Sequence, residues 1–242
     1  DAFANLDLGS FSSTVEYLIV LGTADNTITG NSANDILHTG SGYDVIYASL
    51  GSDYVNGGDG VDILSYLSLI NSPLGARQTG ISANITGLNA AVSDGFGGTD
   101  IVQKIEQYRG TNFDDTYSLS GKFSEFVNET GNVQITLSAF GNTSVGDTID
   151  ANGMTETGGV LINLGPGSTN GYVSKNVALE NVDFANTVTL NDFENAIGSD
   201  YNDVIIGNDG NNVLIGGAGA DKIDGGGGID VIRFDPNSAG VT

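Results

Sequence analysis

The sequence predicts an all-β protein in which short parallel strands stack as the coils of a solenoid. First, a nine-residue pattern recurs in two blocks of the 242-residue chain, and a short fixed period is typical of repeat architectures. Second, glycine takes 37 positions and proline only 3, which suits tight turns that visit positive φ. Third, the apolar runs are short, as at residues 133–137 and 188–190, and none predicts a helix longer than two turns.

Each nine-residue unit has Asp or Asn at its sixth position and a large apolar residue two positions later. Five units follow one another over residues 21–65, four cover residues 198–233, and a lone unit lies at residues 110–118. The sixth positions hold Asn26, Asp35, Asp44, Asp53, Asp62, Asp115, Asp203, Asn212, Asp221 and Asp230. The eighth positions hold Ile28, Leu37, Ile46, Val55, Leu64, Tyr117, Ile205, Leu214, Ile223 and Ile232. All of these except Tyr117 are aliphatic, which chance spacing would not produce.

The residue types explain how one unit folds. Its first six residues are rich in glycine and make a turn, because glycine visits positive φ without steric cost. Its last three residues make a short strand whose middle side chain points inward, because successive side chains of a strand alternate faces. Two units complete one coil, so units 18 residues apart stack. The sixth-position residues that then meet are Asn26 with Asp44, Asp35 with Asp53, Asp44 with Asp62, Asp203 with Asp221, and Asn212 with Asp230.

These units resemble the repeats-in-toxin (RTX, hemolysin-type) nonapeptide G-G-x-G-x-D-x-U-x, in which U is a large apolar residue. Residues 57–65 and 216–224 match it almost letter for letter, whereas residues 48–56 and 110–118 are degenerate copies. The resemblance covers about a third of the chain and implies a parallel β-roll, a form of β-solenoid, that binds Ca²⁺. The candidate calcium-binding residues are Asn26, Gly30, Asp35, Gly40, Gly42, Asp44, Gly51, Asp53, Gly57, Gly60, Asp62, Asp115, Gly198, Asp203, Gly207, Gly210, Asn212, Gly216, Gly219, Asp221, Gly225, Gly228 and Asp230.

The chemistry of the turns points to the same ion. Carboxylates stacked this closely repel one another unless a cation lies between them. Carboxylate and carbonyl oxygens in flexible loops suit Ca²⁺ better than Zn²⁺ or Mg²⁺. Five stacked pairs predict at least about five ions, and each ion held at about 100-fold its dissociation constant would add roughly 2.7 kcal/mol of stability. Calcium is therefore expected to decide whether the chain folds; the alternative is a set of Asp-rich turns that binds no metal.

Composition excludes several other classes of protein. The chain has 30 acidic and 7 basic residues, a formal net charge of −23 and a pI near 4.1, which argues against a nucleic-acid partner. The absence of cysteine excludes disulfide, zinc–thiolate and iron–sulfur scaffolds. The longest apolar run, residues 18–21, is too short to span a bilayer. No cleavable signal peptide is visible at the start, so we expect the chain to be a segment of a longer protein.

The remaining sequence divides into segments around the two repeat blocks. We expect one or more N-terminal cap strands in residues 1–20, a β-roll block at 21–66, and a second block at 193–235, followed by a tail at 236–242. Residues 67–192 are expected to form wider β-rich coils, with the isolated unit at 110–118. One composite module occurs twice there, over roughly residues 57–118 and 142–206. Each module begins with Asp followed two positions later by a large apolar residue (D-x-U). An apolar strand, a polar loop and a strand with Glu at its start then follow in this order.

The sequence offers little for catalysis. The only histidine, His38, lies at an outward ninth position, no G-x-S-x-G motif is present, and there is no Trp to stack on sugar rings. Glu106 and Glu194 occupy matching places in the two modules, which favours a structural role over a catalytic pair. The Asp235-Pro236 bond is weak support for self-cleavage, and residues 216–222 resemble a phosphate loop only faintly. We therefore predict a protein that is not an enzyme.

The seventh positions are expected to face solvent, yet several are apolar. This ladder of apolar seventh-position residues has two explanations. It reflects the β-propensity of these residues, or it is covered by polar loops of the middle region or by a partner chain. Its members are Ile36, Val45, Tyr54, Ile63, Val204, Val213 and Val231.

Family resemblance implies a calcium-binding structural segment of a secreted or cell-surface bacterial RTX protein. Such a segment would be exported unfolded by a one-step (type I) route and fold on Ca²⁺ outside the cell, as a scaffold or adhesin module. The alternative is an accessory or glycan-binding module of an extracellular polysaccharide-acting enzyme, or a segment that carries that activity itself. The expected partners are calcium ions, together with a cell-surface polysaccharide or another protein chain; neither nucleic acid nor a membrane span is expected.

Overall fold

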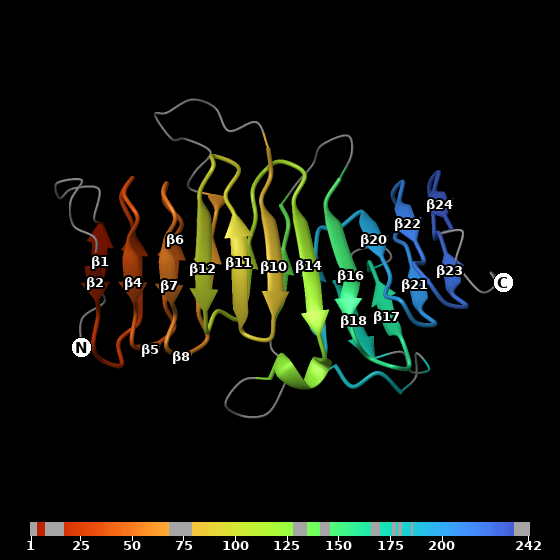
Figure 1. The fold of residues 1–242 in the computed structure, drawn as a ribbon, viewed down its shortest axis with the longest axis horizontal. Helices are drawn as coiled ribbons and strands as arrows, with labels where there is room; N and C mark the ends of the chain where they lie inside the picture. The colour runs from red at the N-terminus through yellow and green to blue at the C-terminus, as the bar shows by residue number, and fades with distance from the viewer. Residues whose placement is uncertain are drawn as a thin grey trace.

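The computed structural model describes residues 4–7, 17–67, 79–127, 135–140, 146–165, 170–175, 178, 181–184 and 186–234. Within these ranges the chain is all-β, with one 3-10 helix, η3 (Phe123–Glu125), and no α-helix. The strands lie side by side across the long axis of the molecule, with the N-terminus at one end and the C-terminus at the other (Figure 1). The predicted fold class, a parallel β-roll or solenoid with wider coils between two repeat blocks, is confirmed.

Most strands belong to two eleven-stranded sheets, and strands that follow one another within a repeat block alternate between them. The first sheet runs in the order β1 (Ala4–Asp7), β3 (Asn26–Thr29), β6 (Val45–Tyr47), β9 (Ile63–Ser65), β13 (Gln107–Arg109), β15 (Thr136–Ser138), β19 (Val188–Asn191), β18 (Gly171–Lys175), β17 (Val160–Asn163), β21 (Val204–Ile206) and β23 (Lys222–Asp224). The second sheet runs in the order β2 (Tyr17–Ile19), β4 (Ile36–His38), β7 (Tyr54–Asn56), β12 (Thr99–Gln103), β11 (Asn89–Ser93), β10 (Ser82–Thr86), β14 (Thr116–Gly121), β16 (Thr148–Met154), β20 (Asn195–Ile197), β22 (Val213–Ile215) and β24 (Val231–Arg233). A small third sheet pairs β5 (Ser41–Gly42) with β8 (Asp59–Gly60).

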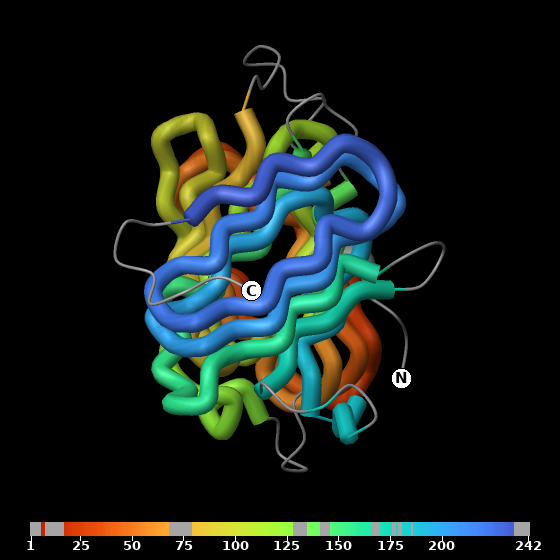
Figure 2. The backbone as a smooth tube through the Cα atoms, turned by 90° about the vertical axis from the view of Figure 1, so that its right-hand side faces the viewer, coloured from red at the N-terminus to blue at the C-terminus, as the bar shows by residue number. Residues whose placement is uncertain are grey.

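The register of the repeat blocks follows the predicted two units per coil. Ile28 pairs with Ile46 and Ile46 with Leu64, in parallel strands that are 18 residues apart. The same offset pairs Leu37 with Val55 on the opposite sheet. Viewed end-on, the last coils run one behind another as flattened loops (Figure 2). The eighth-position side chains therefore form continuous columns between the two sheets.

The middle of the chain widens these coils by two antiparallel insertions. In the second sheet, β10, β11 and β12 form an antiparallel meander, and its outer strands pair in parallel with β14 and β7. In the first sheet, β17, β18 and β19 form a second meander, whose outer strands pair in parallel with β21 and β15. Each meander therefore inserts two antiparallel pairs into a sheet whose other pairs are parallel.

The core lies between the sheets and is built on the eighth positions. Those of the five N-terminal units, of the lone unit and of the first two C-terminal units are at most 2% exposed. In the last coil Ile223 is half-buried and Ile232 is 39% exposed, because the described residues place no further coil over them. Larger aromatic residues fill the wider middle coils, where Tyr117 and Phe193 pack edge-to-face with ring centroids 5.6 Å apart.

The seventh positions are only partly as predicted. Ile63 is buried and Val231 is exposed, whereas the other five members of the ladder are half-buried. The Asp235-Pro236 bond, the tail at 236–242, and residues 133–134 and 142–145 lie outside the described residues.

Candidate calcium sites

The sixth-position residues form ladders that run along the axis of the roll. In each, a backbone N–H donates to the side-chain Oδ1 of the sixth-position residue one coil further on. The five predicted pairs are all in contact in this way: Asn26 with Asp44 at 2.7 Å, Asp35 with Asp53 at 2.9 Å, Asp44 with Asp62 at 3.0 Å, Asp203 with Asp221 at 2.9 Å, and Asn212 with Asp230 at 3.0 Å. The contact differs in one respect from the expectation, because a carboxylate meets a backbone N–H and not a second carboxylate.

The second carboxylate oxygen, Oδ2, has two kinds of environment. In Asp35, Asp115 and Asp203 it accepts the N–H of the residue four positions earlier and so braces its own turn, at 2.6–2.7 Å. In Asp44, Asp62 and Asp221, by contrast, Oδ2 is buried and has no hydrogen-bond partner within the described part of the chain. An ionised carboxylate with one buried oxygen that accepts no hydrogen bond destabilises the folded state unless a proton or a cation binds that oxygen.

The glycines at the first position of the unit face these oxygens. A β-carbon on Gly57 would lie 2.6 Å from Asp62 Oδ2 and 2.3 Å from the carbonyl oxygen of Lys104. A β-carbon on Gly216 would lie 2.4 Å from Asp221 Oδ2. First-position glycines therefore leave room for carboxylate oxygens that any side chain would displace. The same relation to the sixth position holds at Gly30, Gly198, Gly207 and Gly225.

The glycines at the second and fourth positions bring successive turns close together. Gly58 and Gly60 have φ of +91° and +132°, and their β-carbons would lie 1.8 and 1.9 Å from the carbonyl oxygens of Gly40 and Gly42. Gly51, Gly219 and Gly228 likewise combine positive φ with close approach to a carbonyl oxygen of the preceding coil. Gly210 differs, since its nearest contact is Asn208 Oδ1 at 3.1 Å. Stacked turns are thus lined by carbonyl and carboxylate oxygens.

Burial changes the acidity of the ladder. It raises the pKa of Asp62 to about 8, and the nearby carboxylates of Glu106 and Asp44 add to the rise. Burial also raises the pKa of Asp53 to about 7 and that of Asp203 to about 6. Asp221 shifts in the same direction for the same reason. Without a cation, the folded protein therefore stabilises the ionised form of these carboxylates poorly.

The ladders also include four acidic residues that the sequence did not predict as site residues. Asp100 accepts the N–H of Asp53 at 3.0 Å and Asp147 accepts that of Asp115 at 2.6 Å, through Oδ1 in both. Each precedes a buried aliphatic residue by two positions. The D-x-U pattern of the repeats therefore also occurs at these two residues, outside the nine-residue units aligned above. Residues 95–103 thus stack on residues 48–56 as a further unit, besides the isolated unit at 110–118.

The other two residues are the matched glutamates. Glu106 Oε2 accepts the N–H of Asp62 at 2.9 Å, and Glu194 Oε2 accepts that of Asp147 at 2.8 Å. Both follow a left-handed residue and a buried apolar one: Lys104 (φ 53°) and Ile105 in the first module, Asp192 (φ 62°) and Phe193 in the second. The two glutamates continue the ladder where a meander interrupts the repeats.

The donor set fits a hard cation. Ca²⁺ takes six to eight oxygen ligands, which carboxylates, carbonyls and water can supply together. Among the described residues, no group of three or more His, Cys, Asp or Glu side chains gathers at one point. Carbonyl and water oxygens would therefore complete each site. His38, half-buried in β4, takes no part in any of these contacts in the described ranges.

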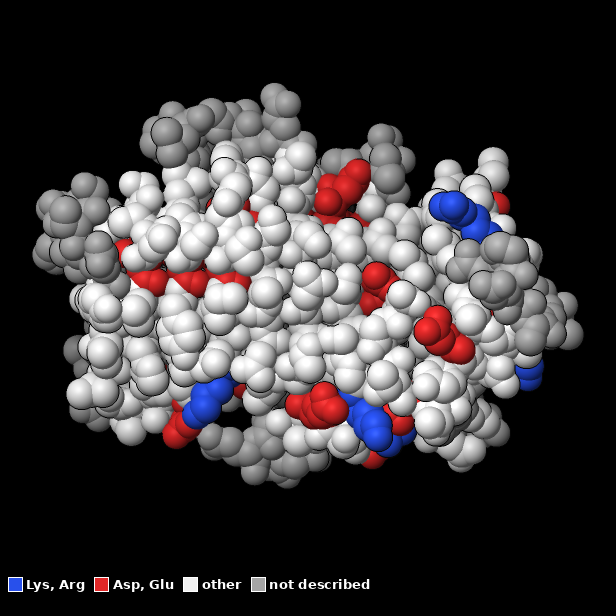
Figure 3. Space-filling view, viewed as in Figure 1, with Lys and Arg blue, Asp and Glu red and all other residues white. Residues whose placement is uncertain are grey.

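The acidic surface is consistent with cation binding. Figure 3 shows acidic side chains in a row across the N-terminal half of the face in view, whereas the few basic side chains lie along its lower edge and towards its right-hand end. Among the basic residues, Lys104 forms an ion pair with Asp59 at 2.8 Å. No helix among the described residues is both long and apolar enough to cross a membrane.

Comparison with known families agrees with this geometry. The family described as "RTX calcium-binding nonapeptide repeat (4 copies)" matches residues 19–46, 29–64 and 197–232. No curated protein matches the chain. The repeats of this family bind Ca²⁺ and are typically structural and non-catalytic. Residues 19–64 and 197–232 are therefore RTX calcium-binding nonapeptide repeats, folded as the two ends of a parallel β-roll.

Proposed function

We propose that the chain is a calcium-dependent folding segment that serves as a rigid scaffold or adhesion module. The observation that carries this proposal is the set of buried, unpartnered Oδ2 atoms in Asp44, Asp62 and Asp221 within the described residues. Each belongs to a carboxylate that cannot be charged cheaply without a counter-ion. Ca²⁺ supplies that charge, and the family of the repeats supports the choice of ion.

The proposed ligands are the sixth-position side chains and the glycine-rich turns between stacked units. The five stacked pairs predict at least about five ions per chain. Ions that bind the folded state alone would add their binding free energies to its stability, so calcium would switch the chain from unfolded to folded. A chain that stays unfolded at low calcium suits export from the bacterial cytosol and folding at the cell surface.

Circular dichroism tests this switch. In EGTA at pH 8 the spectrum should lack β-structure, and millimolar Ca²⁺ should restore it, with Mg²⁺ at the same concentration as the control. A spectrum that is already β-rich in EGTA and unchanged by Ca²⁺ would refute the proposal. Equilibrium dialysis in Ca²⁺ would then count the ions that each chain binds.

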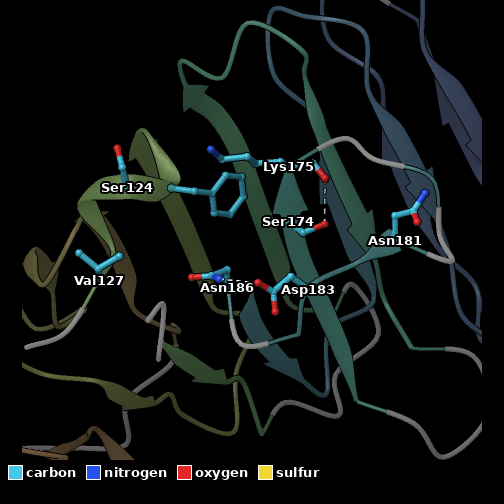
Figure 4. Close-up of a pocket in the computed structure, with 8 residues that line it drawn as sticks. Ser124, Val127, Ser174, Lys175, Asn181, Asp183 and Asn186 are labelled. Carbon is cyan, nitrogen blue, oxygen red and sulfur yellow. Dashed lines mark hydrogen bonds between the residues drawn. The ribbon is translucent and has the colours of Figure 1, made fainter. Parts of the chain in front are cut away.

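A pocket in the middle region favours a second function, the recognition of a glycan. It has a volume of about 410 Å³ and lies between η3 and β18. The side chains of Lys175, Asp183 and Asn186 surround it (Figure 4), and Phe123 and Val127 supply apolar surface. This size and mixture are typical of small-ligand sites.

The charges and hydrogen-bonding groups of the pocket indicate a neutral sugar. One cation, one carboxylate, amides and hydroxyls together offer donors and acceptors without a large net charge. Asp183 Oδ2 already orients the Asn186 amide at 2.6 Å. Titration of the calcium-loaded chain with neutral oligosaccharides, followed by NMR, should shift resonances of these residues. Asp183→Ala should abolish the shifts and Asp209→Ala, on an exposed turn, should leave them unchanged; binding that survives Asp183→Ala would contradict this assignment.

A further inference from the structure

The loop that joins β11 to β12 carries a carboxylate that none of the repeats accounts for. Asp94 is 0% exposed, although it lies outside both repeat blocks and outside the sixth-position ladders. Its Oδ1 accepts the N–H groups of Phe96 at 2.8 Å and Gly98 at 3.0 Å, which fixes the side chain inside the loop. Its Oδ2 is buried and has no hydrogen-bond partner among the described residues.

The unpartnered oxygen lies near a second oxygen, from the first repeat block. A β-carbon on Gly98 would lie 2.9 Å from Asp94 Oδ2 and 1.8 Å from the carbonyl oxygen of Gly51. Both oxygens therefore lie beside Gly98, where any side chain would clash with them. No donor among the described residues bonds to Asp94 Oδ2 there.

Two contacts hold this loop firmly on the turn of residues 48–53. The N–H of Thr99 donates to Ser52 Oγ at 3.0 Å, and the N–H of Asp53 donates to Asp100 Oδ1 at 3.0 Å. Asp100 is further fixed by Tyr66, whose hydroxyl donates to Oδ2 at 2.8 Å. The segments that carry the two oxygens are therefore held against each other by the fold.

We infer that Asp94 and the Gly51 carbonyl are two ligands of a further calcium site, which links the β11–β12 loop to the first repeat block. Both are hard oxygen ligands of the kind that Ca²⁺ prefers. Since no third acidic, histidine or cysteine side chain joins a cluster here in the described chain, backbone carbonyls and water complete the coordination. The ion would couple the first meander to the roll, so that calcium orders part of the middle region as well as the repeats.

A proton could satisfy the same pair of oxygens, because a neutral carboxyl would donate to the carbonyl. Asp94→Asn separates the two possibilities. The amide keeps an acceptor for the loop N–H groups and offers an N–H to the carbonyl of Gly51, as a protonated acid would, but it is a much weaker calcium ligand. Asp183→Asn is the matched control, since it removes the same charge from an exposed residue outside the repeats.

The inference rests on the proposed calcium-dependent fold, and the experiment distinguishes failure of one from failure of the other. Equilibrium dialysis with ⁴⁵Ca²⁺ should show one ion fewer per chain for Asp94→Asn than for the unaltered protein and for Asp183→Asn. Equal ion counts in all three would overturn the site but leave the proposed function standing. If the unaltered chain binds no Ca²⁺, the proposed function itself fails.

Crystals of the unaltered chain grown in CaCl₂ give a second readout that does not depend on how the variant folds. An anomalous difference peak beside Gly98 would support the site. Peaks in the repeat turns without one beside Gly98 would overturn it.

Discussion

The backbone N–H of Asp44 donates to Oδ1 of Asp62 at 3.0 Å, although the two residues are 18 positions apart. Asp44 is at the same time an acceptor, since its own Oδ1 receives the N–H of Asn26 at 2.7 Å. Asp44 is therefore a link between the coil before it and the coil after it. Loss of one carboxylate should loosen two stacked turns and not only its own.

Asp44→Ala tests this coupling. The substitution removes the acceptor of both the backbone N–H and the side-chain Nδ2 of Asn26, and Asn26 is only 5% exposed. A buried donor left without a partner costs about 1–3 kcal/mol. Urea unfolding in saturating Ca²⁺ should show at least this loss, together with any lost calcium binding.

Asp200→Ala is the control for the Asp44 variant, because Asp200 is exposed at the third position of its unit. It should change the free energy of unfolding by less than about 0.5 kcal/mol. Equal losses in the two variants would show that the ladder does not stabilise the roll.

Gly58→Ala tests the close stacking of the turns. Gly58 has a φ of +91°, and a β-carbon there would lie 1.8 Å from the carbonyl oxygen of Gly40. The backbone would have to move, so we expect a loss of about 2–4 kcal/mol or failure to fold in Ca²⁺. Gly158→Ala is the matched control, since nothing lies within 4 Å of its β-carbon position. Thermal unfolding of both variants in Ca²⁺ checks this, and a Gly58→Ala protein as stable as Gly158→Ala would contradict the stacking.

Glu106→Ala and Glu106→Gln test whether the matched glutamates are structural. Glu106 is 4% exposed and accepts the N–H of Asp62 at 2.9 Å. The alanine variant leaves that N–H without an acceptor and should lose about 1–3 kcal/mol, whereas glutamine keeps an acceptor oxygen and should lose less. Urea unfolding in Ca²⁺ measures both. A glutamine variant as unstable as the alanine variant would instead mean that the charge of Glu106, not its hydrogen bond, is required.

The local part of this architecture could be predicted from the sequence, and the distant part could not. The contacts of Asp44 with Asn26 and Asp62 follow from a fixed spacing, so the period alone predicts them. Glu106 reaches Asp62 across 44 residues and replaces Asp by a longer side chain, so neither period nor residue type indicates it. The buried carboxylate of Asp94 depends on how a meander docks on the first block, which is a matter of tertiary packing. The same holds for the pocket beside η3.

The pH dependence of the metal-free chain follows from the raised pKa values of the ladder. Asp62, Asp53 and Asp203 have pKa values of about 8, 7 and 6 in the folded state, against an ordinary value of 3.8 that they regain on unfolding. Between about pH 4 and pH 8 the folded chain therefore binds more protons than the unfolded chain, and its free energy of unfolding falls as the pH rises. Bound Ca²⁺ requires the ionised carboxylates, so in saturating calcium this fall should vanish or reverse. Circular dichroism at pH 5 and pH 8 in calcium-depleted buffer measures the first dependence, as the amount of β-structure that the metal-free chain keeps at each pH. Urea unfolding in Ca²⁺ at the same two pH values measures the second. Asp62→Asn should make the stability of the metal-free protein less dependent on pH, because it removes the carboxyl group with the largest pKa shift. A metal-free chain that is more stable at pH 8 than at pH 5 would show that burial of these carboxylates does not destabilise the fold.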